Sequence, residues 1–159
     1  MRRVLDTIII LFVVALSASA QQIEFHKASW TEVKKLAHES GKSIFVDVYT
    51  SWCGPCKKMA STVFTDPSVG TYMNEHFVSI QLDAEKEKDY ELFKMYQPNG
   101  YPSFYWFDAE GTLLDTQVGY MPAEEFIGKS KKALESNLGK QYKLSLIHIS
   151  EPTRRRGIS

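Results

Sequence analysis

Hydrophobic residues recur along the chain with periods that predict alternating helices and strands. In the first segment they share one helical face, which consists of Trp30, Val33, Leu36 and Ala37. Ser29 and Glu32 have the Ser-x-x-Glu spacing of a capping box, and Gly41 is suited to end the helix. The pattern therefore predicts a helix over residues 29–40 with that face toward the core.

Four further runs are predicted to be strands. Residues 43–49 and 77–83 are almost continuously apolar and rich in β-branched and aromatic residues, which is typical of strands covered on both faces. Residues 103–107 and 112–118 are joined by a turn that ends in glycine. The second pair is therefore expected to form a hairpin.

Helices are expected between and after these strands. Residues 57–60 have a helical pattern, and Asp66 followed by Pro67 supplies an N-cap with proline at the first helical position. A closing helix is predicted over residues 121–135.

Residues 85–96 are expected to form a helix with a polar outer face. Its inward positions are Tyr90, Phe93 and either Met95 or Tyr96. Helices and strands then alternate up to the final hairpin. This order predicts an α/β fold with a central mixed β-sheet flanked by helices on both faces.

The first twenty residues have the pattern of a cleavable export signal. Arg2 and Arg3 precede an apolar run over residues 7–16, and the segment 18–20, Ala-Ser-Ala, has the small-x-small form that signal peptidase cleaves. A membrane anchor is the alternative, but a run of about ten residues is short for crossing a bilayer. We therefore expect an exported chain whose mature form begins at Gln21.

The composition changes abruptly near the C-terminus. Residues 21–144 contain 14 lysines and no arginine, whereas residues 154–156 are three arginines in a row. Residues 145–154 match the translation of a transposon-type sequencing adapter residue for residue. We therefore expect one domain over 21–138, the start of a truncated continuation over 139–144, and a non-native tail over 145–159. A native tail is the alternative.

The composition also excludes some classes of function. Hydrophobic residues make up 43% of the 159 residues and charged residues 24%, as in an ordinary globular domain. The 19 basic residues balance the 19 acidic ones, so no large basic face is expected. Nucleic acid is therefore not an expected partner. Separately, we expect the domain to act as a monomer.

The chain has two cysteines, Cys53 and Cys56. A loop this short restrains little chain entropy, so chemistry explains the pair better than stapling. Thiol–disulfide exchange needs an accessible thiolate and a second thiol within reach. At a helix start, free N–H groups and the helix dipole favour a negative sulfur on the first cysteine. We therefore assign Cys53 as the exposed attacking nucleophile and Cys56 as the more covered resolving thiol.

Three neighbours complete the motif. Gly54 allows another backbone to approach closely, and Pro55 lacks an N–H group where a helix start can spare one. Trp52 is expected to provide apolar cover beside the reactive sulfur.

A zinc or copper site is the alternative use of the cysteine pair. Zinc needs about four ligands, of which the pair supplies two. The histidines show no ligand spacing near the pair; they are His26, His38, His76 and His148. We therefore expect no metal, and no cofactor beyond the redox-active Cys53–Cys56 disulfide itself.

Residues 46–57, Val-Asp-Val-Tyr-Thr-Ser-Trp-Cys-Gly-Pro-Cys-Lys, resemble the active-site strand and loop of thioredoxins. The resemblance covers residues 25–136 and implies the thioredoxin fold and dithiol–disulfide exchange. Residues 62–69 and 77–83 resemble the exported thioredoxin-like branch, which includes the thiol domain of transmembrane electron-conduit reductases. That branch implies the bacterial periplasm, protein disulfide substrates and a membrane-bound electron donor.

The resemblance also implies a role for Asp47. It matches the buried aspartate of thioredoxins, which accepts the proton of the resolving thiol. Gln81 stands where the family often has a lysine. The alternative is a solvent-facing aspartate, against which the apolar neighbours of Asp47 argue.

Two turns match the surface on which thioredoxins dock their substrates. Tyr101 and Pro102 match the cis-proline turn, which presents the backbone of the preceding residue to an extended substrate. A trans proline in an ordinary loop is the alternative. Gly119 matches the glycine of the docking surface, although a plain strand-end glycine has the same appearance.

Together these features favour an exported reductase of protein disulfides, because Gly54 and Pro55 resemble the pair of reducing family members more than that of strong oxidants. A disulfide isomerase or oxidant is the alternative enzyme. A module that binds partners on the thioredoxin surface, with secondary redox activity, is the alternative outside the enzymes.

Overall fold

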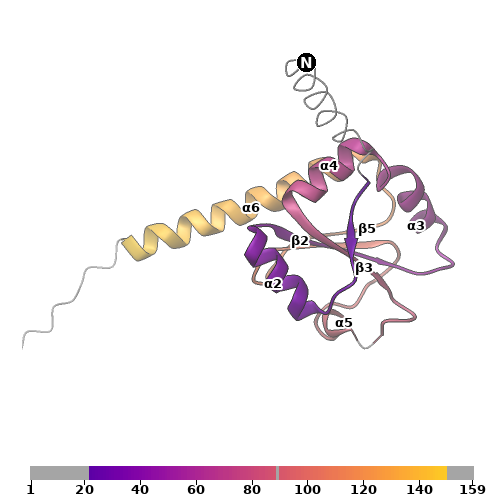
Figure 1. Ribbon diagram of the computed structural model, residues 1–159, viewed down its shortest axis with the longest axis horizontal. Helices are drawn as coiled ribbons and strands as arrows, with labels where there is room; N and C mark the ends of the chain where they lie inside the picture. The colour runs from indigo at the N-terminus through magenta and orange to yellow at the C-terminus, as the bar shows by residue number, and fades with distance from the viewer. Residues whose placement is uncertain (1–21, 89, 150–159) are drawn as a thin grey trace, which may run out of the picture.

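The structure, a computed structural model, describes residues 22–88 and 90–149. The expected export signal and the last part of the expected tail lie outside these residues. The strands are β1 (Phe25–His26), β2 (Ser43–Tyr49), β3 (Phe77–Asp83), β4 (Ser103–Phe107) and β5 (Leu113–Val118). The helices are α2 (Trp30–Ser40), α3 (Gly54–Lys58), the π-helical segment η1 (Met59–Val63), α4 (Pro67–His76), α5 (Glu91–Met95) and α6 (Ala123–Ile149). Figure 1 shows them in chain order by colour.

The five strands form one mixed sheet in the order β1–β3–β2–β4–β5. β1, β3 and β2 run parallel, whereas β4 is antiparallel to β2 and β5 is antiparallel to β4. Helices pack on both faces of this sheet. The predicted α/β architecture with a central mixed sheet is therefore confirmed.

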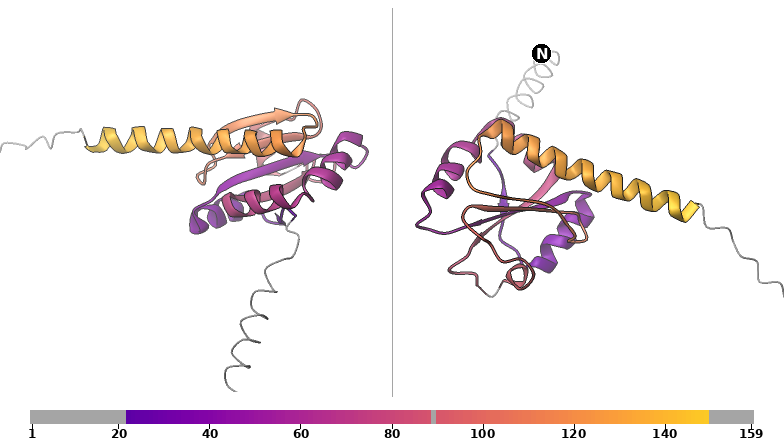
Figure 2. Two further views of the ribbon diagram at one scale, coloured as in Figure 1. Left: turned by 90° about the horizontal axis from the view of Figure 1, so that it is seen from above. Right: turned by 180° about the vertical axis from the view of Figure 1, so that it is seen from behind.

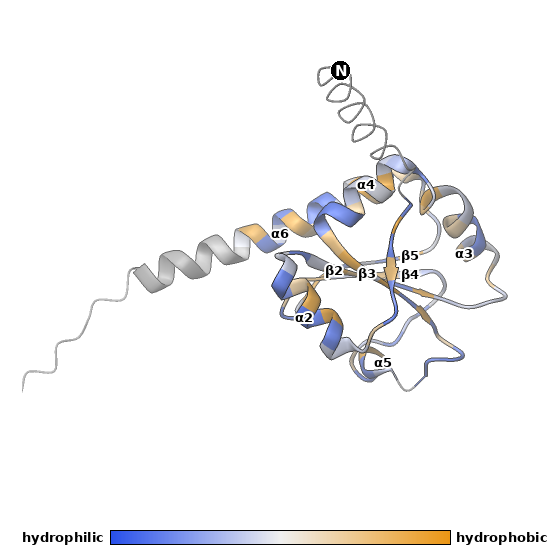
Figure 3. Cartoon of the chain, in the orientation of Figure 1, coloured by the Kyte–Doolittle hydropathy of each residue, from blue (hydrophilic) through white to orange (hydrophobic). Residues whose placement is uncertain are grey.

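Strand β2 divides the core into two parts because its side chains alternate between the faces of the sheet. Phe45 packs with residues of η1, α4 and α6, while Ile44, Val46 and Val48 pack with residues of α2 and α5. Figure 3 shows hydrophobic and hydrophilic residues alternating along α2, as an amphipathic helix on a sheet requires. By the same alternation Asp47 falls on the Phe45 face, on the side of α3 and η1.

The ends of α2 and α4 are set by the side chains that the sequence indicated. Ser29 Oγ accepts a hydrogen bond from the Glu32 N–H, and the Glu32 carboxylate accepts one from the Ser29 N–H, so the capping box is present. Gly41 follows α2 with a φ of 67°, in the left-handed region. Asp66 caps α4 by accepting two backbone N–H groups of its first turn.

Leu36 is the one residue of the expected α2 face that lies outside the core. It is 40% exposed, whereas Trp30, Val33 and Ala37 are buried. At about 100° per residue, Leu36 lies at the margin of the arc that the other three define. The prediction for Leu36 is therefore wrong.

Helix α5 is shorter than the helix expected over residues 85–96, because the chain turns first after β3. The Asp83 carboxylate accepts the Glu85 N–H, and the Glu87 carboxylate accepts the Asp83 N–H. Such side chain–backbone bonds compete with a helix, so only five residues are α-helical. Of the expected inward residues, Tyr90, Phe93 and Tyr96 pack in the core, whereas Met95 is exposed.

The remaining differences concern β1, η1 and α6. The pattern did not predict β1, which is only two residues long, or the π-helical form of η1. Helix α6 begins at Ala123 and runs to Ile149, past the expected end at Glu135, and it extends away from the sheet (Figure 2). The non-native origin of residues 145–159 stays a prediction. Within the described ranges, no helix has the length and apolar content that a bilayer crossing requires.

Trp106 is the largest fully buried side chain, and its indole N–H donates its hydrogen bond to a serine. Nε1 donates to Ser130 Oγ (3.1 Å), and the Ser130 hydroxyl donates to the Phe126 carbonyl oxygen (2.9 Å). We predict that Ser130→Ala lowers the free energy of unfolding by about 1–3 kcal/mol, because the indole N–H would stay buried without its acceptor.

Urea denaturation with a matched control measures this loss. Ser136 lies on the same helix, is exposed, and bonds only the Ala133 carbonyl oxygen of its own helix. Ser136→Ala should therefore change the free energy of unfolding by less than about 0.5 kcal/mol. Equal denaturation midpoints for the two variants would show that the buried indole bond adds no stability.

Candidate active site

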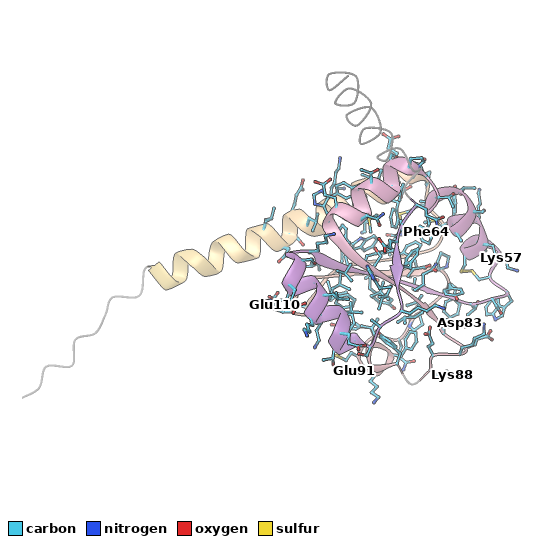
Figure 4. All side chains as sticks on the ribbon, in the orientation of Figure 1. Lys57, Phe64, Asp83, Lys88, Glu91 and Glu110 are labelled. Carbon is cyan, nitrogen blue, oxygen red and sulfur yellow. A yellow bond between two sulfur atoms is a disulfide. The ribbon has the colours of Figure 1, made fainter. Side chains whose placement is uncertain are left out.

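The two cysteines form a disulfide at the start of α3, directly after β2. Cys53 is the N-cap residue, and its Sγ accepts a hydrogen bond from the Cys56 N–H (3.1 Å). The first turn of α3 has no acidic side chain, and Lys57 and Lys58 occupy its last turn. Lys57 points outward beside the sulfur atoms (Figure 4). The Cys53 sulfur therefore lies where helix N–H groups favour a thiolate once the disulfide is reduced.

Both cysteines are buried in the disulfide form. Cys53 is 4% exposed and Cys56 is 6% exposed. The expected difference, with Cys53 exposed and Cys56 more covered, is therefore wrong for this state. The physical reason is that the Cys53 sulfur turns back over the first turn of α3, where it bonds Cys56 Sγ and accepts the Cys56 N–H.

The other expected site residues lie at the same end of the sheet. The Tyr101–Pro102 peptide bond is cis, as expected, and immediately precedes β4. Gly119 follows β5 with a φ of 94°, and its N–H donates to the Pro102 carbonyl oxygen (2.8 Å). Trp52 is 64% exposed, and its ring meets the Tyr101 ring edge to face with 5.9 Å between centroids. The structure thus brings the cysteine loop, the proline turn and the Gly119 turn together.

Two side chains that the sequence reasoning missed join this group. Lys58 Nζ lies 4.1 Å from the centroid of the Tyr120 ring, a cation–π contact that ties α3 to the loop after Gly119. The only signal in the sequence was an aromatic residue directly after that glycine. Gly54 and Pro55 are exposed, and a Cβ at Gly54 would meet no atom within 4 Å apart from its chain neighbours and the backbone of its own helix. The surface over the first turn of α3 is therefore open.

Asp47 is buried in the middle of β2, where it is 2% exposed. The solvent-facing alternative is therefore wrong. Gln81 lies opposite Asp47 in the register of β2 and β3, and its Nε2 donates to Asp47 Oδ2 (2.9 Å). The other oxygen, Oδ1, is buried and has no hydrogen-bond partner among the described residues.

This burial changes the acidity of the carboxyl group. Desolvation disfavours the carboxylate and raises the pKa of Asp47 from 3.8 to about 7, while the hydrogen bond from Gln81 acts in the opposite direction. Asp47 is therefore able to take up or release a proton in the neutral pH range.

A cavity of about 280 Å³ connects the carboxyl group with the resolving cysteine. Asp47, Thr50, Cys56, Ala60 and Gln81 are among its lining residues. The Thr50 hydroxyl is buried and has no partner within the described part of the chain. A cavity of this size with polar lining residues has room for water molecules, which would connect Cys56 with Asp47.

Metal-ligating side chains do not gather in the described part of the chain. Within residues 22–88 and 90–149, no group of three or more His, Cys, Asp or Glu side chains is arranged to hold a metal ion. The reactive groups that the structure brings together are the two sulfurs and the buried carboxyl group.

Known proteins with similar sequences carry out the same type of chemistry. A family model described as a thioredoxin-like domain matches residues 30–134, more than half of the chain. The thiol:disulfide interchange protein DsbD of Colwellia psychrerythraea is 34% identical over 114 residues, which cover 69% of this chain and 18% of that protein. DsbD of Tatumella citrea is 32% identical over 102 residues, which cover 62% of this chain and 18% of that protein. The match thus spans about a fifth of the length of these relatives.

Solved structures agree with the sequence matches. A disulphide-isomerase candidate from Bacteroides thetaiotaomicron superposes with a TM-score of 0.65 at 39% identity, covering 75% of this chain and 98% of that chain. The C-terminal domain of Neisseria meningitidis DsbD, in its oxidised form, superposes with a TM-score of 0.55 at 25% identity, covering 65% and 90%. The expected thioredoxin fold is confirmed, and the chain belongs to the thioredoxin-like family as a thiol–disulfide oxidoreductase domain with a CXXC-type cysteine pair.

Proposed function

We propose that this domain is an exported reductase of protein disulfides, in which Cys53 attacks and Cys56 resolves. One observation carries the proposal: Cys56 of the disulfide at the start of α3 shares a cavity with a buried carboxyl group that makes no ion pair among the described residues. Repeated reduction of disulfides requires a nucleophile, a resolving thiol and a proton acceptor, and we assign these roles to Cys53, Cys56 and Asp47.

The reaction proceeds in two exchange steps. In the reduced protein the Cys53 thiolate attacks one sulfur of a substrate disulfide, which forms a mixed disulfide and releases the other substrate sulfur as a thiolate. Cys56 then gives its proton to Asp47 through the shared cavity, and its sulfur attacks Cys53 Sγ. The second substrate thiolate leaves with the electron pair of the broken bond, and the Cys53–Cys56 disulfide remains.

We assign substrate docking to the residues around the disulfide. Tyr101 and Pro102 present backbone groups beside α3, and the open surface over Gly54 and Pro55 admits an extended segment. Trp52 and the turn at Gly119 supply apolar area at either side. A substrate strand then lies across the first turn of α3 with its disulfide over Cys53.

The proposed location is the bacterial periplasm, and the proposed electron donor is a membrane-bound protein that reduces the Cys53–Cys56 disulfide after each turnover. The similarity to DsbD supports this, because the named relatives are thiol:disulfide interchange proteins. We propose that the domain acts as a monomer on protein disulfides.

Disulfide isomerisation is the second candidate. It is favoured by the 39% identity to the disulphide-isomerase candidate of Bacteroides thetaiotaomicron. An isomerase restores activity to scrambled ribonuclease without net reduction, whereas a reductase precipitates insulin in the presence of dithiothreitol. The ratio of the two activities decides between the candidates.

We predict that Cys53→Ser abolishes insulin reduction, because no thiolate remains at the helix start. Cys56→Ser is the matched variant: it keeps the nucleophile and should accumulate a mixed disulfide that mass spectrometry detects. Limiting iodoacetamide should label Cys53 first in the reduced wild type, since its thiol is the more acidic. Preferential labelling of Cys56 would reverse the two roles.

We predict that Asp47→Asn slows the resolving step roughly 100-fold or more, because general-base catalysis of this kind contributes about 10²–10⁴-fold. Stopped-flow mixing of the reduced protein with a small aromatic disulfide separates the release of the first and second aromatic thiolates. The rate of first release is the internal control and should stay unchanged. A second release as fast as in the wild type at neutral pH contradicts the role of Asp47.

Asp47 also makes stability depend on pH. The pKa of Asp47 is about 7 in the folded state and near 3.8 in the unfolded state. The folded protein therefore has its full stability from the protonated carboxyl group below pH 4. Between pH 4 and pH 7 the free energy of unfolding falls by roughly 4 kcal/mol in total. We predict that Asp47→Asn is more stable than the wild type at pH 8 and that this gain disappears near pH 4. Melting temperatures at both pH values measure it, and an equal difference at both would refute the raised pKa.

A further inference from the structure

Gln81 holds one oxygen of Asp47 and leaves the other unengaged. Its Nε2 donates to Oδ2 across the β2–β3 pair (2.9 Å), while Oδ1 is buried and meets no donor among the described residues. A carboxyl group with one hydrogen-bonded oxygen keeps a fixed orientation, because rotation about its C–C bond would break the hydrogen bond. The two oxygens of Asp47 are therefore not equivalent.

Gln81 also lines three cavities. Besides the cavity of about 280 Å³ that contains Asp47 and Cys56, it lines one of about 180 Å³ next to Phe64 and one of about 360 Å³ next to His26. Of these two, one lies toward η1 and the other toward β1. The Gln81 side chain is only partly buried, whereas the carboxyl group that it bonds is 2% exposed.

The titratable side chains near Asp47 line two cavities. Tyr49 and Lys57 line the Asp47 cavity, and the neighbouring one is lined by His26, Lys27, Tyr49, Asp83, Lys86 and Glu87. η1 contributes only Ala60 to the Asp47 cavity, and β4 places Phe104 opposite Asp47. Among the residues whose side chains are described, Asp47 makes no ion pair.

We propose that Gln81 is a positioning residue for proton transfer, which holds Asp47 Oδ2 and so leaves Oδ1 to take the Cys56 proton. The inference rests on the proposed role of Asp47 as proton acceptor. The Cys56 S–H bond breaks, its proton passes to Oδ1, and the sulfur electron pair forms the bond to Cys53 Sγ. The Cys53–substrate bond breaks with its electron pair on the substrate sulfur, and Asp47 afterwards releases the proton to solvent.

A neutral amide suits this role better than a cation. A lysine beside a buried carboxylate stabilises the charged form and lowers the pKa, so the carboxyl group would be ionised but a weaker base. An amide donates a hydrogen bond without adding a charge. With Gln81 in place, Asp47 is able to accept a proton during resolution and lose it again afterwards at neutral pH.

Two substitutions at Gln81 move the pKa of Asp47 in opposite directions. Gln81→Leu removes the donor to Oδ2 and should raise the pKa, while Gln81→Lys brings a cation near the carboxylate and should lower it by roughly one unit or more. Two readouts apply to the full chain: the ¹³C shift of the Asp47 carboxyl carbon against pH, and the pH profile of the second thiolate release. The midpoint of the carbon-shift titration and the midpoint of the pH profile should move together in each variant.

Ser79→Ala is the matched control. Ser79 lies on the same face of β3 two residues away, and its hydroxyl is buried without a partner in the described chain, but it does not line the Asp47 cavity. Its midpoints should equal those of the wild type.

The outcomes separate this inference from the proposed function. If Asp47→Asn slows resolution but both Gln81 variants keep the wild-type midpoints, Asp47 stays the acceptor and the role of Gln81 is refuted. If Asp47→Asn leaves resolution unchanged, both fall together. Should Gln81→Leu fail to fold, Gln81→Lys alone decides, because an unchanged carboxyl midpoint in that variant overturns the inference.

Discussion

The burial of strand β2 on both faces is the constraint on which the site depends. A central strand covered on both faces is buried along its length, so the loop that follows it starts from a fixed position. Four residues separate the end of β2 from α3, and the cysteines lie at the N-cap and in the first turn of that helix. The same burial removes water from Asp47, which stands on the face toward α3 and η1. One structural fact therefore provides both a rigid base for the sulfurs and an unusual carboxyl group beneath them.

The antiparallel direction of β4 and β5 completes the arrangement. The end of β2, the start of β4 and the end of β5 lie together at one end of the strands, where Val48, Ser103 and Val118 are neighbours in register. Three turns far apart in the chain therefore meet beside the disulfide. The bond from the Gly119 N–H to the Pro102 carbonyl oxygen and the contact between Lys58 and Tyr120 hold them to one another.

The parts of the fold that the sequence predicts are those set by local interactions. The caps at Ser29 and Asp66 act within four residues, and the apolar runs of β2 and β3 need no partner to be recognised. β1 was missed because two residues carry no period, and their strand character comes only from pairing with β3. The helix expected from residue 85 lost its first turns because carboxylates of Asp83 and Glu87 bind nearby N–H groups instead.

The site divides in the same way. The cysteine pair was expected from its motif, and the buried Asp47 and the cis bond before Pro102 were expected from the resemblance to thioredoxins; the structure has each of them. The exposure of Cys53 was not predictable, because it depends on the direction in which the sulfur turns within the first turn of α3. The contact between Lys58 and Tyr120 joins residues far apart in sequence, so no local sequence pattern predicts it.

The cavity beneath the disulfide has a consequence for how long a partner stays attached. Burial raises the pKa of the Asp47 carboxyl group to about 7, so protonated and ionised molecules coexist near neutral pH. Under the proposed mechanism the ionised molecules resolve their mixed disulfide promptly, and the protonated ones wait for a proton to leave. In the proposed location, the bacterial periplasm, the acidity follows that of the medium outside. Acid surroundings would then lengthen the life of each covalent complex, and the environment of the cell would set the residence time of its partners.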